Sequence, residues 1–108
     1  MWTDLIAALT ATGYKFAHYG WAKNAPETKR DYGVYGEDDE IALYADNKRA
    51  EAVLQGTIDY YTRDDSGTPK STIETALDSY NIPYRVESIQ FENDTGYIHY
   101  EWVFEVVR

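Results

Sequence analysis

Residues 97–107 read YIHYEWVFEVV, and this stretch decides the fold. Apolar and polar residues alternate along it, as in a β-strand with one buried face. The predicted buried face consists of Ile98, Tyr100, Trp102, Phe104 and Val106. A second alternating run, YRVESIQF at 84–91, precedes it, and the turn sequence NDTG at 93–96 joins the two. The pattern predicts an antiparallel hairpin whose apolar face packs against another layer of the protein.

A first helix is expected over residues 2–12, at the beginning of the chain. Thr3 can cap its N-terminus, and Gly13 is a natural C-terminal stop. The predicted apolar stripe consists of Leu5, Ile6 and Leu9.

A second helix is expected over residues 69–80. Thr68 can cap it, and Pro69 suits its first turn because that position needs no backbone N–H. Asn81 can adopt the left-handed conformation that ends a helix. The predicted buried stripe consists of Ile73, Ala76, Leu77 and Tyr80.

Strands and turns occupy the region between the two helices. Strands are expected at 14–19, 31–36 and 50–62. The sequence EDDE at 37–40 is interpreted as an acidic turn from which 41–44 starts the way back, and ADNKR at 45–49 as a hairpin tip. The predicted fold is α+β: a twisted antiparallel sheet with two helices packed on one face, in the order α-β-β-β-α-β-β. All of it fits one domain over residues 1–108.

Composition limits the classes of function. The 108 residues include 19 acidic and 10 basic ones, a net charge of -9, which argues against specific nucleic-acid binding. No cysteine is present, so disulfides and thiolate chemistry are excluded. The apolar run LIAAL at 5–9 is too short for a signal or membrane segment, so no membrane association is expected.

Candidate catalytic residues are few. His18 and His99 fall within predicted strands, and no serine or cysteine motif accompanies them. The acids at 38–40 together with Asp46 could supply oxygen ligands for calcium, but their spacing does not match an EF-hand loop. The sequence therefore predicts a protein that is not an enzyme, with no cofactor and no metal site.

Aromatic residues point instead to an interaction surface. Eleven tyrosines and three tryptophans exceed what a core of this size needs, and such side chains are favoured at interfaces. Those predicted to lie beside loops are Tyr14, Tyr19, Trp21, Tyr32 and Tyr44. Self-association is the first expectation.

A series of short motifs resembles one family along nearly the whole chain. The motifs, in order, are FAHY at 16–19, YGVY at 32–35 with EDD at 37–39, ADN at 45–47, IDYYT at 58–62, NIPY at 81–84 and YI at 97–98. Together they resemble the tail terminator, or tail completion, proteins of long-tailed phages and prophages. This chain departs from that pattern in having only Pro26 in the loop before the second strand, and Lys48-Arg49-Ala50 after ADN.

The resemblance implies a structural role in the virion. Members of the family form a ring, usually a hexamer, on the head-proximal end of the tail tube, where it stops tube polymerisation and joins the head. The implied partners are further copies of this chain, the tail tube protein and a head-completion or connector protein, assembled in the host cytoplasm. Expected interface residues are Trp21, Tyr32, Glu37, Asp38, Asp39, Glu40, Tyr44, Asp46, Asn47, Lys48 and Arg49.

Alternatives of other classes remain open at this point. The chain can be another head–tail connector, or a minor tail or capsid protein of the same virion. The net charge also suits an acidic inhibitor that mimics DNA, although the acids are predicted to cluster at turns rather than along one face. A small metal-dependent hydrolase requires a metal ion in the region 38–46.

Overall fold

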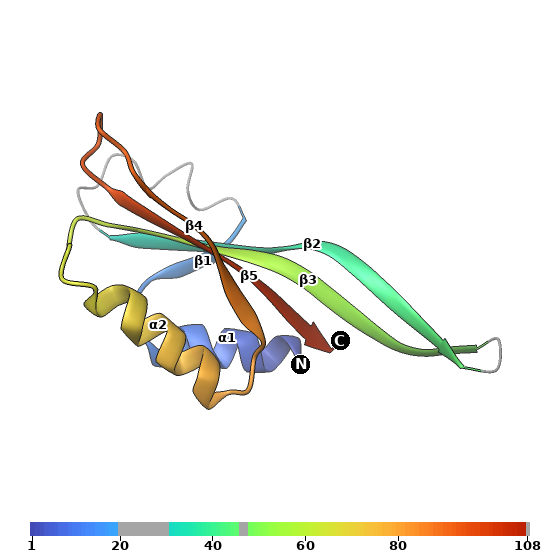
Figure 1. The fold of residues 1–108 in the computed structure, drawn as a ribbon. Coiled ribbons are helices and arrows are strands. Elements are labelled where there is room, and N and C mark those ends of the chain that lie inside the picture. Colours follow the sequence, from blue (N-terminus) through green and yellow to red (C-terminus); the bar gives the residue numbers. More distant parts are fainter. Residues whose placement is uncertain (20–30, 46–47, 108) are drawn as a thin grey trace.

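The computed structural model describes residues 1–19, 31–45 and 48–107 (Figure 1). Within these ranges, the side chains of residues 42–45 and 48–51 are not described. Its elements are α1 (Trp2–Ala11), β1 (Phe16–His18), β2 (Tyr32–Ala45), β3 (Lys48–Thr62), α2 (Thr68–Ser79), β4 (Tyr84–Phe91) and β5 (Ile98–Val107). The predicted α+β class and the order of helices and strands are confirmed. So is the C-terminal hairpin, formed by β4 and β5.

The five strands form one sheet in the order β1-β2-β3-β5-β4. All neighbours pair antiparallel except β1, which runs parallel to β2 with Phe16 beside Gly33 and His18 beside Tyr35. The prediction of a wholly antiparallel sheet is therefore wrong at this edge. A parallel pair needs a long crossover connection, and residues 19–31 supply one.

Both helices cover the same face of the sheet (Figure 1). The core between the layers combines α1, α2, β3 and β5, and the predicted inward face of β5 is confirmed. Trp102 is fully buried, and its indole N–H donates to Oε2 of Glu74 on α2 at 2.9 Å. The polar atom of the largest core side chain is thus satisfied rather than stranded.

The helix stripes differ from the prediction at one residue each. On α1, Leu5, Ala8 and Leu9 are buried at the i, i+3, i+4 spacing, whereas Ile6 is turned away and 39% exposed. On α2, Ile73 and Leu77 are buried but Tyr80 is exposed. Tyr80 follows the last helical residue, so helical geometry does not carry it onto the stripe.

The helix ends are partly as predicted. Gly13 and Asn81 have positive φ angles of 77° and 57°, which confirms both stops. Thr3 and Thr68 are not the caps, because Met1 and Gly67 occupy the N-cap positions without a side-chain cap hydrogen bond.

The acidic sequence at 37–40 is not a turn. It lies within β2, which continues to Ala45, and the pairing with β3 shifts register between Glu37 and Asp39. Such a shift marks a β-bulge, which bends a strand without ending it. The reversal falls later, between Ala45 and Lys48, so the predicted hairpin at ADNKR is confirmed.

Beyond the end of β5, β2 and β3 continue alone. Val53 pairs with Val107 of β5, and from there to Ala45 and Lys48 the two strands pair only with each other in the described part of the chain. We call this two-stranded ribbon, residues 42–45 and 48–52, the arm. It extends well past the helices (Figure 1), and the molecule measures 53 × 26 × 21 Å.

Candidate functional site

The acidic bulge of β2 forms the base of the arm. Nε2 of His18 lies 2.6 Å from Oε1 of Glu37, and the Tyr19 hydroxyl donates to the Glu37 carbonyl oxygen at 2.5 Å. The Thr57 hydroxyl of β3 donates to Oδ2 of Asp38, also at 2.5 Å. Side chains from β1 and β3 therefore hold the first two acids in fixed positions.

The negative charge of Glu37 persists across the physiological pH range. The Tyr19 hydroxyl, a backbone N–H and the His18 ring lower the pKa of Glu37 to about 2. The neighbouring Glu37 carboxylate in turn raises the pKa of Tyr19, so that the phenol stays protonated. Asp39 and Glu40 continue along the exposed part of the strand, which leaves the base strongly acidic.

A cluster of aromatic residues lies at the end of the sheet opposite the arm. Tyr32 stacks on Tyr61 at 4.6 Å between ring centroids and meets the edge of Tyr97 at 5.7 Å. The Arg63 guanidinium covers the Tyr97 ring at 4.0 Å. Tyr32, predicted at an interface, is only 8% exposed and packs within the subunit.

His99 of β5 joins this cluster with two carboxylates. Its Nε2 lies 2.7 Å from Oδ1 of Asp59, its Nδ1 lies 3.8 Å from Oε2 of Glu92, and its ring stacks on Tyr61. The hydrogen bond to Asp59 raises the pKa of His99, against the opposing effect of burial, and the charges of Glu92 and Glu101 add to the rise. The folded state therefore favours the protonated ring more than the unfolded chain does.

Stability should depend on the protonation of His99. Because its pKa is higher in the folded than in the unfolded chain, its contribution is complete below the ordinary value of 6.5 and is lost as pH rises through the folded value. We expect the free energy of unfolding, measured in urea titrations, to fall as the pH rises above the ordinary histidine pKa of 6.5. Glu37 does not contribute in this window, since its lowered pKa acts only in acid.

His99→Gln is the matched variant, because glutamine can still donate to Asp59 but does not titrate. It should flatten the pH dependence of stability over this range. An unchanged slope in the variant would assign the dependence to another group.

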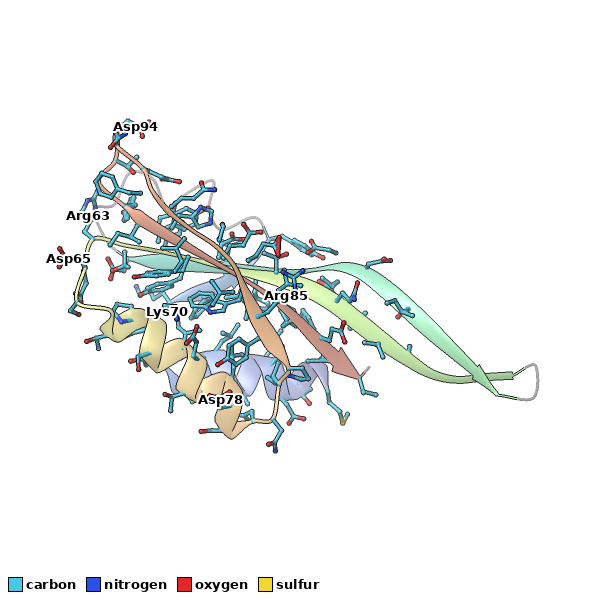
Figure 2. The ribbon with its side chains drawn as sticks, viewed as in Figure 1. Arg63, Asp65, Lys70, Asp78, Arg85 and Asp94 are labelled. Carbon is cyan, nitrogen blue, oxygen red and sulfur yellow. The ribbon has the colours of Figure 1, made fainter. Side chains whose placement is uncertain are left out.

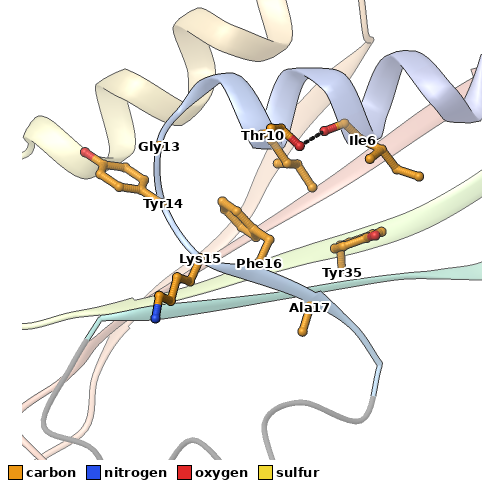
Figure 3. A pocket seen from close by; sticks show the side chains of 9 residues that line it. Ile6, Thr10, Gly13, Tyr14, Lys15, Phe16, Ala17 and Tyr35 are labelled. Atoms are coloured by element: carbon orange, nitrogen blue, oxygen red, sulfur yellow. Dashed lines mark hydrogen bonds between the residues drawn. The ribbon is translucent and has the colours of Figure 1, made fainter.

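A shallow pocket lies between α1 and β1 (Figure 3). It is lined by Ile6, Leu9, Thr10, Gly13, Tyr14, Lys15, Phe16, Ala17 and Tyr35. The Thr10 hydroxyl is already donating to the Ile6 carbonyl oxygen at 2.8 Å, and Lys15 points away from α1. These lining residues offer an apolar recess rather than converging acid and base groups.

The structure places the predicted interface residues at separate points. Glu37, Asp38, Asp39 and Glu40 lie at the arm base, whereas Lys48 and Arg49 begin β3 at the far end of the arm. The backbone of Tyr44 pairs with that of Arg49, but the side chains of Tyr44, Lys48 and Arg49 lie outside the described part. Trp21, Asp46 and Asn47 also fall outside the described residues.

The edge strand β4 carries a candidate surface that was not expected from the sequence. Val86, Ile89 and Phe91 are 39%, 54% and 62% exposed, and we call them the β4 edge patch. The apolar residues of YRVESIQF indicate a strand with an apolar face, but the same pattern is typical of a strand whose face is buried in the core. Only the position of β4 at the end of the sheet reveals the exposure.

Within residues 1–19, 31–45 and 48–107, the candidate functional surfaces are the arm base, the aromatic cluster around His99, the pocket beside α1 and the β4 edge patch. No group of three or more histidine, aspartate and glutamate residues suited to a metal ion occurs in these ranges. No helix in them is long and apolar enough to cross a membrane. The sequence of the chain matches no known protein family and no curated protein.

Proposed function

We propose that this protein is a structural subunit of a phage or prophage tail. In this proposal it caps the head-proximal end of the tail tube as an oligomeric ring, ends tube polymerisation and presents the surface that joins the head. The motif order along the sequence suggests this role, and the projecting arm is the observation that carries it.

The arm is built for contact with another chain. An isolated two-stranded ribbon is marginally stable in water, and its free edges offer unpaired backbone groups. The part of β2 that leads into and along the arm, residues 41–45, reads IALYA, which is apolar for a ribbon without a third strand. A neighbouring protein that covers the arm would supply hydrogen bonds to its strand edges and would bury its apolar residues.

The two ends of the arm differ in charge. Its base carries the four acids at 37–40, whereas the tip sequence DNKR at 46–49 carries two bases and one acid. Opposite charges at opposite ends favour head-to-tail contacts, in which the tip of one arm meets the base of the next. Contacts of this heterologous kind close into rings when the rotation between subunits allows it.

Substitution of the arm tip tests the function. Replacing Asp46, Asn47 and Lys48 together by alanine should leave the fold intact, because the tip lies far from the core, yet yield tails of uncontrolled length. The measurement is electron microscopy of tails made when the variant replaces the natural protein, with circular dichroism to verify folding.

A matched control lies at the other hairpin. Asn93→Ala with Asp94→Ala removes similar side chains from the exposed turn between β4 and β5 and should leave tail length normal. Tails of normal length with the arm-tip variant would show that the tip is not the contact.

A second candidate, an acidic inhibitor that mimics DNA, gains support from the position of the acids. They do not cluster only at turns, since 37–40 lies within β2, and Asp59 pairs across the sheet with Glu101. Inhibition of a DNA-cleaving nuclease by the purified protein, relieved by salt, would favour this candidate over the tail subunit.

A further inference from the structure

We propose that the free edge of β4 pairs with the same edge of a second copy of this chain, in an antiparallel and two-fold symmetric contact. This contact is distinct from the head-to-tail arm contact and does not depend on the tail function. It predicts a dimer of the subunit in solution.

Within the described part of the chain, no strand pairs with the outer edge of β4, so the backbone there presents a row of hydrogen-bonding groups. Glu92 N–H donates to the Tyr97 carbonyl oxygen at 2.8 Å, and Glu105 N–H donates to the Pro83 carbonyl oxygen at 3.1 Å. Residues alternate between facing the partner strand and facing away in an antiparallel pair. The backbones that face away from β5 are therefore those of Tyr84, Val86, Ile89 and Phe91.

The β4 edge patch belongs to these same outward-facing residues. Val86 lies opposite Trp102, Ile89 opposite Tyr100 and Phe91 opposite Ile98, so the patch shares the sheet face on which the helices pack. It continues the apolar core outward to an edge where both backbone and side chains are available. Natural edge strands usually avoid this combination, because it promotes association.

A self-complementary register exists for this edge. The register shift between Val86 and Ser88 interrupts the strand, which leaves 88–92 as the regular segment. When Gln90 faces the partner's Gln90, Ile89 lies opposite the partner's Phe91, and Phe91 lies opposite the partner's Ile89. The two residues of each Ile89–Phe91 pair then exchange their backbone hydrogen bonds. No two like charges are opposed in this register.

Charge favours a second copy as the occupant. Arg85 lies near the beginning of β4, where it also forms an ion pair with Glu87 of the same strand. Asp94 lies at the opposite, hairpin end (Figure 2), close in the chain to Glu92, which follows β4. A two-fold antiparallel pairing brings the acidic end of each copy toward the partner's Arg85, twice over. A partner of unrelated sequence would have to supply this charge order, whereas this chain already carries it.

Sedimentation analysis over a range of protein concentrations tests the dimer. The natural chain should dimerise, and Ile89→Lys should weaken self-association by at least about tenfold. Ile6→Lys is the matched control, since Ile6 on α1 is similarly exposed but distant from β4, and it should leave self-association unchanged. A natural chain that stays monomeric at all concentrations, or an Ile89→Lys variant that still dimerises fully, would overturn the proposal.

Two further measurements identify the edge itself. Amide hydrogen exchange at Ile89 and Phe91 should slow as the protein concentration rises, because these N–H groups are bonded only in the dimer. Arg85→Glu should weaken the dimer, and adding Asp94→Arg to that variant should restore it. Exchange that is independent of concentration would overturn edge pairing, whereas tail length measures the proposed function separately.

Discussion

Replacing Trp102 by alanine should lower the free energy of unfolding by about 3–5 kcal/mol. The side chain is fully buried in the core between the sheet and the helices, and its ring packs against that of Tyr100. Truncation removes this apolar contact and leaves a cavity that a two-layer core cannot readily close. Because small domains have a total stability of about 5–15 kcal/mol, urea denaturation should find the variant close to unfolding.

Trp102→Phe separates the packing from the hydrogen bond. Phenylalanine retains much of the volume but cannot donate to Glu74, whose carboxylate keeps Lys70 as a partner at 2.9 Å. The expected loss is smaller, about 1–3 kcal/mol. Equal losses in the two variants would mean that the hydrogen bond, rather than the packing, dominates at this position.

Gly56→Ala should destabilise the protein by about 3 kcal/mol, a large effect for one methyl group. Gly56 lies on β3 between Glu37 of β2 and Phe104 of β5. An added Cβ would overlap the carbonyl oxygen of Gly36 and the ring of Phe104. The backbone atom cannot move without disturbing the β2–β3 pairing, so thermal denaturation should show a midpoint lower by more than about 10 °C.

Gly36→Ala provides the contrast at the same place in the sheet. The nearest atoms to its Cβ would belong to the ring of Tyr19, which is half exposed and can move if it gives up its hydrogen bond to the Glu37 carbonyl oxygen. We expect a smaller loss, about 1 kcal/mol. A comparable loss in both variants would show that β2 tolerates no added side chain near the bulge, whatever its neighbour.

Gly56 also connects stability to the arm. It pairs with Glu37, next to the β-bulge from which the arm departs. A methyl group there would disturb the arm base as well as the core. Gly56→Ala should therefore affect both folding and any contact that the acidic base makes.

Local signals explain which elements sequence reasoning could find. The alternation at 97–107 and the stop signals at Gly13 and Asn81 each involve neighbouring residues, and the structure confirms all three. The acidic segment at 37–40 misled because consecutive acids are typical of turns, while β3 alongside keeps them in an extended strand. The tail role, the ring and its partners remain predictions.

The sequence by itself determined the helices, the C-terminal hairpin and the face of β5 that is buried, because periodicity and chain-breaking residues act over a few positions. Only the tertiary structure decided that β1 runs parallel to β2 and that Tyr32 is buried. It also decided that, among the described residues, no further strand lies beside the arm or the β4 edge. These features depend on which strands become neighbours, and that choice is made by contacts between residues far apart in the chain.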